Sequence, residues 1–261
     1  LLISFPYSNR VTVTVLTGAE IVAYGQSLRL IEREPHSLGD IVRMSAENAV
    51  LATYFRNNVL HLFALPSLIA CVFASNARVS TADIQRLAWR VYPYIGAELF
   101  LHWSEAELPG VVEATLASLA AQGLIEPEPD GGAWRRPSPA SAQAMQLSLL
   151  AQTTLQIIER YYMVVAQLVL AGSGTLTQPA LEERCQQTAQ RMTLLSGLDS
   201  PEFSDRSMFA NFIALLRARG VIRAAGGGVL EYDEVLVRVA QDAQFVLSEQ
   251  LRHSILQIMH S

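Results

Sequence analysis

Apolar side chains recur along this chain at intervals of three and four residues, the spacing of one face of an α-helix. Two such runs are long, 51–76 (LATYFRNNVLHLFALPSLIACVFASN) and 146–170. Residues 57–77 contain no Asp, Glu, Lys or Arg, and a second uncharged segment, 161–181, is interrupted at AGSGT. Both approach the length of a membrane span, but the interruption and the Asn, His, Pro and Ser side chains favour buried helices over transmembrane or interfacial ones.

Capping residues predict where the helices begin. Ser or Thr followed three residues later by Glu is the spacing of a capping box, and it occurs at Thr17 and Ser104. Ser45 and Ser80 are further N-cap candidates. The helix after Ser45 continues into the first apolar run, where Pro66 is expected to kink or divide it.

Glycine and proline predict where the helices end. Pro93 with Gly96 should end the helix that follows Ser80, and EREPHSLGD (32–40) should end the helix that follows Thr17. Gly123 and Gly220 have the position of C-terminal caps, and each is followed by apolar residues and a Gly-rich turn. The two segments after these glycines are therefore predicted to be β-hairpins.

The two halves of the chain repeat each other. A shift of 97 residues places Gly123 on Gly220, and it places Val79–Ser80 on Leu176–Thr177. Each half then contains a long apolar helix, a capped helix, a second helix that ends in Gly, and a hairpin. A repeat of this kind indicates one shared supersecondary unit.

The predicted fold is mainly α, with two winged-helix-like units, each with a small hairpin, packed on the long apolar helices. The expected divisions are an N-terminal lead-in and helix (1–50), a first unit (51–136), a linker (137–146), a second unit (147–232) and one C-terminal helix (233–261).

Composition adds an expectation about surfaces. Hydrophobic residues make up 51% of the chain, charged residues 16%, and the mean hydropathy is +0.25. Some of the surface should therefore meet a membrane or another polypeptide, or the chain is cut from a larger protein, since it starts at Leu rather than Met. Cys71 and Cys185 lack metal-ligand spacing and are predicted to be reduced core residues.

A winged helix raises the possibility of DNA binding, which the charges disfavour. The net charge is −5; the predicted helix after Ser104 has three Glu and no Arg, and that before Gly220 has Arg only near its end. A recognition helix needs cations for the phosphates and donors for base edges. No nucleic acid, cofactor or metal is expected as a ligand.

Four polar residues, Arg56, Asn57, Asn58 and His61, cluster at the start of the first apolar run. They are the candidate site. One interpretation is an anion-binding cluster; the other, which we favour, is a set of polar groups with satisfied partners at the edge of the core.

Catalytic signatures are weak elsewhere. His36 and Asp40 could form an acid–base pair, but no nucleophile signature lies nearby, so a polar loop is the preferred interpretation. His102, His253 and His260 have no convergent ligands in the sequence. The chain is expected to have no catalytic residues of its own.

The phrase TYFRNNVLHLFALPSLIA (53–70) resembles the C-terminal part of the bacterial membrane-bound glycerol-3-phosphate O-acyltransferases. PYSNRVTVT, LIEREPHSLGDIV, IERYY, AGSGTL, PEFSD and MFANFI are similar to the same family and extend from residue 6 to residue 213. The resemblance implies an enzyme of phospholipid biosynthesis that transfers a fatty acyl group from acyl carrier protein or coenzyme A to glycerol 3-phosphate, at the cytoplasmic face of the inner membrane.

In that family a His and an Asp separated by four residues form the catalytic motif, and no histidine of this chain has that spacing. The resemblance therefore implies a non-catalytic C-terminal region, inactive alone, that supports an upstream catalytic domain, peripheral membrane contact or self-association into a homo-oligomer. The alternative is a stand-alone protein-interaction module with tandem winged helices.

Overall fold

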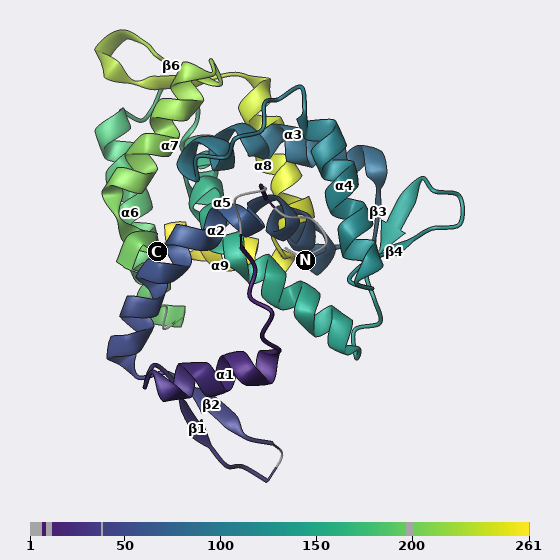
Figure 1. Ribbon diagram of the computed structural model, residues 1–261. Coiled ribbons are helices and arrows are strands. Elements are labelled where there is room, and N and C mark those ends of the chain that lie inside the picture. The colour runs from purple at the N-terminus through teal and green to yellow at the C-terminus, as the bar shows by residue number, and fades with distance from the viewer. Residues whose placement is uncertain (1–6, 9–11, 38, 197–200, 261) are drawn as a thin grey trace.

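A computed structural model describes residues 7–8, 12–37, 39–196 and 201–260. Two long helices, α2 (Ala46–Ser75) and α5 (Ala142–Ala171), pack against each other in its centre (Figure 1). Where they cross, small polar side chains bond across the contact: Ser67 Oγ lies 2.8 Å from Thr154 Oγ1, and Cys71 Sγ lies 3.3 Å from the Ala151 carbonyl oxygen. Small side chains let two helices approach closely, so this crossing defines the centre of the core.

The first winged-helix-like unit follows α2. Its elements are β3 (Arg78–Ser80), α3 (Thr81–Glu98), α4 (Leu108–Ala121), β4 (Glu126–Pro127) and β5 (Ala133–Arg135). The strands form an antiparallel sheet in the order β3-β5-β4, so the strand that precedes the two helices pairs with the hairpin that follows them.

The second unit follows α5 and repeats this order. Its elements are α6 (Gln178–Ser196), η1 (Pro201–Ser204), α7 (Arg206–Ala218), β6 (Ile222–Ala224), η2 (Gly226–Gly228) and β7 (Leu230–Tyr232). An antiparallel bridge between Thr177 and Val229 takes the place of the first strand. The predicted fold class, mainly α with small hairpins, is confirmed.

The glycine stops show the repeat in atomic detail. Gly123 after α4 has φ +68° and Gly220 after α7 has φ +70°. In each case the next amide donates to a carbonyl five residues back, Leu124 to Leu119 and Val221 to Leu216, at 2.9 Å. This left-handed turn closes the helix C-terminus, and glycine adopts it without a steric penalty.

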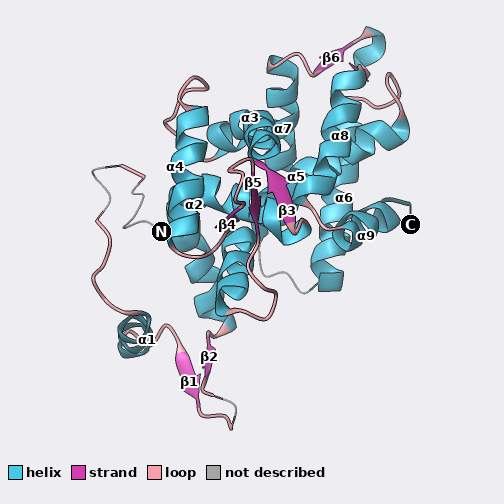
Figure 2. Cartoon of the chain, turned by 90° about the vertical axis from the view of Figure 1, so that its right-hand side faces the viewer, coloured by secondary structure: helices cyan, strands magenta, loops and turns pink. Residues whose placement is uncertain are grey.

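The N-terminal elements stand apart from the rest. We use "arm" for residues 12–59, which contain α1 (Gly18–Ser27), the hairpin β1 (Glu32–Glu34) and β2 (Ile41–Arg43), and the first turns of α2. We use "body" for the described residues from 60 onward. The arm extends away from the body, with α1 lying beside the hairpin (Figures 1 and 2). Asn48 on α2 holds this arrangement by donating to the carbonyl oxygens of Arg29 and Leu30.

Proline and glycine ended fewer helices than the sequence predicted. α2 continues through Pro66, and α3 continues through Pro93 and Gly96 to Glu98. Pro66 and its neighbours are buried, so core packing on both sides offsets the lost backbone hydrogen bond. The prediction that α3 ends near Pro93 was wrong. Residues 32–40, predicted only as a helix breaker, contribute to a hairpin instead, and Leu38 lies outside the described residues.

Two helix starts differ from the predictions. Thr17 forms the predicted capping box with Glu20, but Ser104 does not cap a helix. Glu107 accepts from the Ser104 amide and hydroxyl, and the helix begins only at Leu108. α5 begins at Ala142, capped by Ser141, so the predicted linker 137–146 is helical over its second half.

The predicted single C-terminal helix is two helices, α8 (Glu234–Val246) and α9 (Glu249–His260). Leu247 between them is extended and fully buried, and the Ser248 hydroxyl accepts from the Leu251 amide as a new N-cap. Burial of Leu247 in the core therefore breaks the helix.

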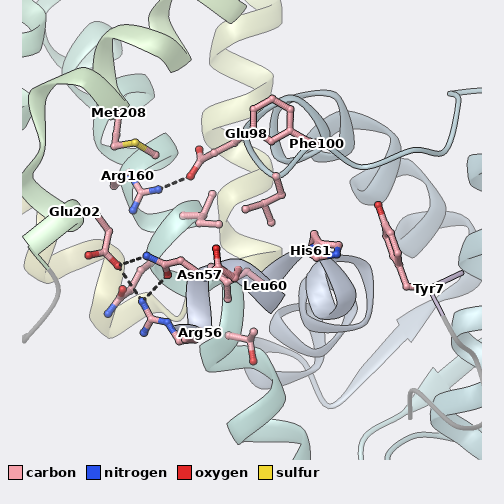
Figure 3. Close-up of a pocket in the computed structure, with 15 residues that line it drawn as sticks. Tyr7, Arg56, Asn57, Leu60, His61, Glu98, Phe100, Arg160, Glu202 and Met208 are labelled. Atoms are coloured by element: carbon pink, nitrogen blue, oxygen red, sulfur yellow. Dashed lines mark hydrogen bonds and ion pairs between the residues drawn. The ribbon is translucent and has the colours of Figure 1, made fainter. Parts of the chain in front are cut away.

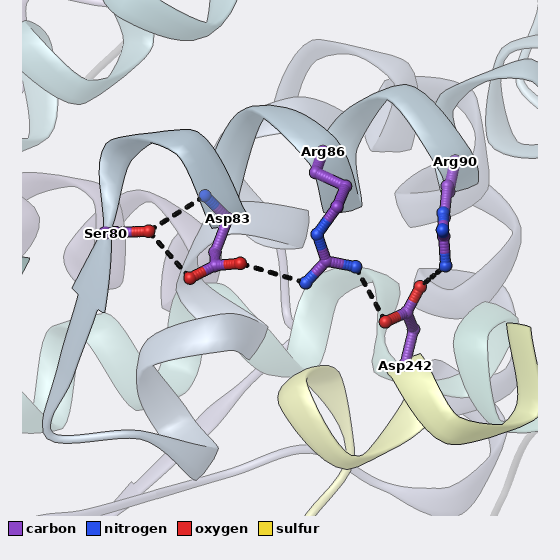
Figure 4. A network of polar contacts seen from close by, with 5 residues as sticks. All are labelled: Ser80, Asp83, Arg86, Arg90 and Asp242. Carbon is purple, nitrogen blue, oxygen red and sulfur yellow. Dashed lines mark hydrogen bonds and ion pairs between the residues drawn. The ribbon is translucent and has the colours of Figure 1, made fainter. Parts of the chain in front are cut away.

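Ion pairs attach α8 to the first unit. Arg86 and Arg90 on α3 both donate to Asp242 on α8, and Asp83 bonds Arg86 from the other side (Figure 4). Asn76 at the end of α2 also donates to the Phe245 carbonyl at 2.8 Å. α8 thereby ties the C-terminal part of the chain to the first unit, and both units contribute to one continuous core.

Candidate functional site

A cavity of about 620 Å³ lies where the two units meet. Its walls come from α2, the end of α3, α5, η1 and α7, and Tyr7 reaches it from the N-terminal segment (Figure 3). All four residues of the predicted polar cluster, Arg56, Asn57, Asn58 and His61, line it. They occupy the stretch of α2 where the helix passes from the exposed arm into the body, and Leu60 is the first buried residue there.

Arg56 and Asn57 share one carboxylate. The Arg56 guanidinium donates to Glu202 Oε1 at 2.9 Å and to Asn57 Oδ1 at 3.3 Å, and Asn57 Nδ2 lies 3.4 Å from the same Glu202 oxygen. Glu202 comes from η1, far away in the sequence. Arg56 and Asn57 therefore have polar partners at the edge of the core.

A second ion pair forms the deeper wall. Arg160 on α5 is 4% exposed and donates to Glu98 Oε1 at 2.5 Å, while the Tyr161 hydroxyl donates to Glu98 Oε2 at 2.7 Å. Burial and the Glu98 charge raise the pKa of Tyr161 well above its usual range. Tyr161 stays a neutral donor, so both oxygens of Glu98 are occupied and Arg160 is fixed in position.

Aromatic rings close the other end. Tyr7 meets the rings of His61, His102 and Trp103 edge-on, at centroid distances of 5.0, 4.5 and 5.0 Å. Burial raises the pKa of Tyr7, partly offset by a hydrogen bond from the His102 backbone. His61 thus contacts an aromatic cluster.

Phe100 stands at the rim. It follows the C-cap of α3, has φ +55° and is 88% exposed. This is the left-handed position that Gly123 and Gly220 occupy after α4 and α7. A non-glycine residue there is strained, and such strain tends to occur at functional positions.

Among the described residues, no group of His, Cys, Asp and Glu has the arrangement of a metal site. Cys71 and Cys185 are fully buried free thiols, and burial raises the pKa of Cys71 to about 12, so neither acts as a nucleophile near neutral pH.

The other candidate pair lies elsewhere. His36 and Asp40 are both exposed at the tip of the β1–β2 hairpin, and Asp40 pairs with Arg33 at 2.6 Å. The preferred interpretation, a polar loop, fits this geometry. His253 and His260 lie on α9, away from the cavity.

Sequence reasoning did not assign Glu98, Arg160, Glu202 or Tyr7 to this site. Arg160 carried one usable signal, because it is a charged residue inside a long apolar helix. The remaining three lie on other elements, and no local pattern places them beside α2.

One helix in the described chain is long and apolar enough to cross a membrane by length and composition, namely α2. Within its most apolar window, 61% of the residues are buried inside the protein. The uncharged segment 161–181 is the end of α5 followed by a turn at Gly172 and the start of α6. Residues 64–73 of the first segment and 163–168 of the second are buried, in line with the predicted buried helices.

The fold and the cavity define a class: a mainly helical protein with tandem winged-helix-like units that enclose a charged cavity. Comparisons with known proteins specify the family. The family model described as the glycerol-3-phosphate acyltransferase C-terminal region matches residues 1–225. This chain belongs to that family.

Curated relatives agree. The glycerol-3-phosphate acyltransferase of Pseudomonas aeruginosa (strain UCBPP-PA14) is 43% identical over 259 residues, which cover 99% of this chain and 31% of the relative. That of Pseudomonas putida (strain W619) is 41% identical with the same coverage. That of Xanthomonas campestris pv. campestris is 40% identical, over 98% of this chain and 29% of the relative. The chain thus spans about a third of the length of these relatives.

Proposed function

We propose that this chain is a non-catalytic C-terminal region of a longer glycerol-3-phosphate acyltransferase, and that its arm binds the preceding part of the same polypeptide. The observation that carries the proposal is the apolar surface of the arm. Most of the exposed large hydrophobic side chains of the described chain lie between residues 15 and 59. Monomeric proteins rarely leave a contiguous apolar surface without a partner.

The elements of the arm are too small to be stable alone. α1 has ten residues and none of them is buried, whereas an isolated helix of that length is marginal in water. β1 and β2 have three residues each, all exposed, and a lone two-stranded hairpin is marginal too. The arm therefore needs a partner surface to hold its shape.

The chemistry of the arm favours a protein partner over a lipid surface. Helices that lie on membranes carry Lys and Arg on their polar face, but this sequence contains no lysine. The hairpin arginines are already paired, Arg33 with Asp40 and Arg43 with Glu34 at 2.8 Å. No positive excess remains there to attract anionic lipid.

The relatives supply a candidate partner. They are about three times as long as this chain, and the match falls on a family of C-terminal regions. A segment that precedes this chain is covalently tethered to the arm, which gives it a high effective concentration. The longer enzyme would acylate glycerol 3-phosphate from acyl-CoA or acyl carrier protein at the cytoplasmic face of the inner membrane.

The test uses the longer enzyme with a photo-crosslinking amino acid in place of Tyr54, which is 64% exposed on the arm. The matched control carries the same amino acid in place of Trp89, which is 46% exposed on α3 of the body. We expect Tyr54, and not Trp89, to crosslink within the chain to peptides that precede it, as identified by mass spectrometry.

Three other outcomes contradict the proposal, and two of them identify another partner. Crosslinks to lipid assign the arm to the membrane, and a product of twice the mass assigns it to self-association. Equal crosslinking at Tyr54 and Trp89 shows that the arm has no specific partner, which would favour a stand-alone interaction module.

A further inference from the structure

The charges that line the cavity are balanced within the protein. Arg56 is paired with Glu202, and Arg160 is paired with Glu98 (Figure 3). These two guanidiniums and two carboxylates together carry no net charge. An ionic ligand would have to separate one of the pairs and leave a charge without its partner, so the cavity favours an occupant without a net charge.

The rest of the lining offers apolar surface and neutral hydrogen-bonding groups. Leu60, Ile157 and Met208 provide apolar side chains beside the ion pairs. Asn58 and Thr153 also line the cavity, and neither side chain has a hydrogen-bond partner among the described residues. An extended polypeptide has the matching groups, because every residue other than proline offers one backbone donor and one acceptor, and its side chains project to either side.

Phe100 provides an aromatic contact point at the rim. Its ring lines the cavity and is 88% exposed. The backbone around it is fixed on the following side, where the Leu101 amide donates to the Gly96 carbonyl at 2.9 Å and the Tyr92 hydroxyl donates to the Trp103 carbonyl at 2.7 Å. Aromatic residues are enriched where proteins contact each other, and a rigid support lowers the entropy lost on binding.

The position of Tyr7 indicates which polypeptide can reach this cavity. Tyr7 lines the cavity and contacts the His61 ring. It lies six residues after the start of this chain, which an extended backbone spans in at most about 22 Å. The relatives are about three times as long as this chain, and the matching family is one of C-terminal regions. The polypeptide that precedes this chain in a longer enzyme is therefore tethered close to the cavity, at a high effective concentration.

We propose that the cavity is a docking site for the polypeptide that precedes this chain in the longer enzyme, and that an apolar side chain of that polypeptide packs against Phe100. A volume of about 620 Å³ is that of a pocket that buries a drug-sized molecule, so it holds a few side chains. This inference rests on the proposed function only in assigning the chain to a longer polypeptide. It does not depend on what the arm binds.

The test uses the longer enzyme with a photo-crosslinking amino acid in place of Phe100. The matched control carries the same amino acid in place of Met145, which is 68% exposed on α5 and does not line this cavity. We expect Phe100, and not Met145, to crosslink within the chain to peptides that precede it, as identified by mass spectrometry. Hydrogen exchange gives a second measurement without any substitution: the amides of residues 99–104 should exchange several-fold more slowly in the longer enzyme than in the 261-residue chain.

The proposal is overturned if Phe100 crosslinks to lipid or to a second copy of the chain, if it crosslinks no more than Met145, or if exchange at residues 99–104 is equally fast in both proteins. The outcome at Tyr54 separates this proposal from that for the arm. Crosslinks to the preceding peptides from Tyr54 but not from Phe100 leave the arm with its partner and remove the docking site, and the opposite result does the reverse.

Discussion

The two halves of α2 are both rich in apolar residues, yet their environments are opposite. Before Leu60 no side chain of the helix is buried, whereas Ala64–Phe73 is buried without interruption. Phe55 is 59% exposed and Phe73 is 0% exposed, in the same helix. Hydrophobicity alone therefore does not define the core of this protein. Helices α5, α8, α3 and α4 all pack against α2, and the hydrogen bonds from α2 to α5 come from its second half, at Ser67 and Cys71.

The largest expected effect is the difference in the free energy of unfolding between F73A and F55A. F73A removes a fully buried ring and should lower the free energy of unfolding by about 3–5 kcal/mol. F55A should change it by less than about 0.5 kcal/mol in the 261-residue chain, because its ring is already in water. Urea unfolding of both variants, followed by circular dichroism, provides the measurement. A large loss for F55A would mean that the arm already packs on something within this chain.

A buried carboxylate, Glu159 on α5, lies beside the second half of α2 and should make stability depend on pH. Burial raises the pKa of Glu159 to about 7, partly offset by Arg160, and the Glu159 charge in turn raises the pKa of Cys71 on α2. The unfolded chain ionises at lower pH, near 4.5. The contribution of Glu159 to stability is therefore largest below about pH 4.5, falls as the pH rises towards 7, and is lower by at most about 3 kcal/mol at pH 8.

E159Q should remove this dependence, because the amide is neutral at every pH. We expect the variant to exceed wild type at pH 8 and to match it near pH 4, as measured by unfolding at each pH. E107Q is the control: hydrogen bonds from the Ser104 hydroxyl and amide lower the pKa of Glu107, so its charge does not change between pH 5 and 8 and the profile over that range should keep its shape. Parallel profiles for E159Q and wild type would show that Glu159 is not the group responsible.

The features predicted correctly from the sequence are those that neighbouring residues determine. Thr17 with Glu20, the N-cap Ser80 and the stops at Gly123 and Gly220 each act within one turn of backbone, and the structure confirms them. The burial of Cys71 and Cys185 also followed from their apolar surroundings.

The features missed depend on contacts between distant segments. The sequence near Pro93 has the local signals of a helix end, but the Tyr94 and Ile95 side chains are buried and the helix continues. The C-terminal segment, in contrast, has no local signal of a break, yet it is divided at Leu247, whose side chain is fully buried in the core. In the cavity, the cluster on α2 was visible in the sequence, whereas its partner Glu202 and the second ion pair, Glu98 with Arg160, come from other elements.

The smallest effect concerns the second exposed phenylalanine. Among the phenylalanines that the structure describes, Phe55 and Phe100 are the exposed ones, and only Phe100 belongs to the body. F100G should raise the free energy of unfolding by about 1 kcal/mol, because glycine relieves the left-handed strain at φ +55° and little apolar contact is lost. Thermal unfolding of F100G and wild type is the measurement. The control is G123A, which replaces glycine by a residue with a Cβ at the left-handed position after α4 and should lower the free energy of unfolding by a similar amount.

A gain in stability at Phe100 would mean that the protein keeps a strained, solvent-exposed ring at the rim of the cavity at a cost to its own folding. Proteins commonly show such a trade-off between stability and function at binding positions. If F100G is less stable than wild type, the ring stabilises the fold, and its position at the rim is no evidence of a trade-off between stability and binding. In that case the exposure of Phe100 is a local feature of a packed body, whereas the exposure of Phe55 is shared with the other apolar side chains of the arm.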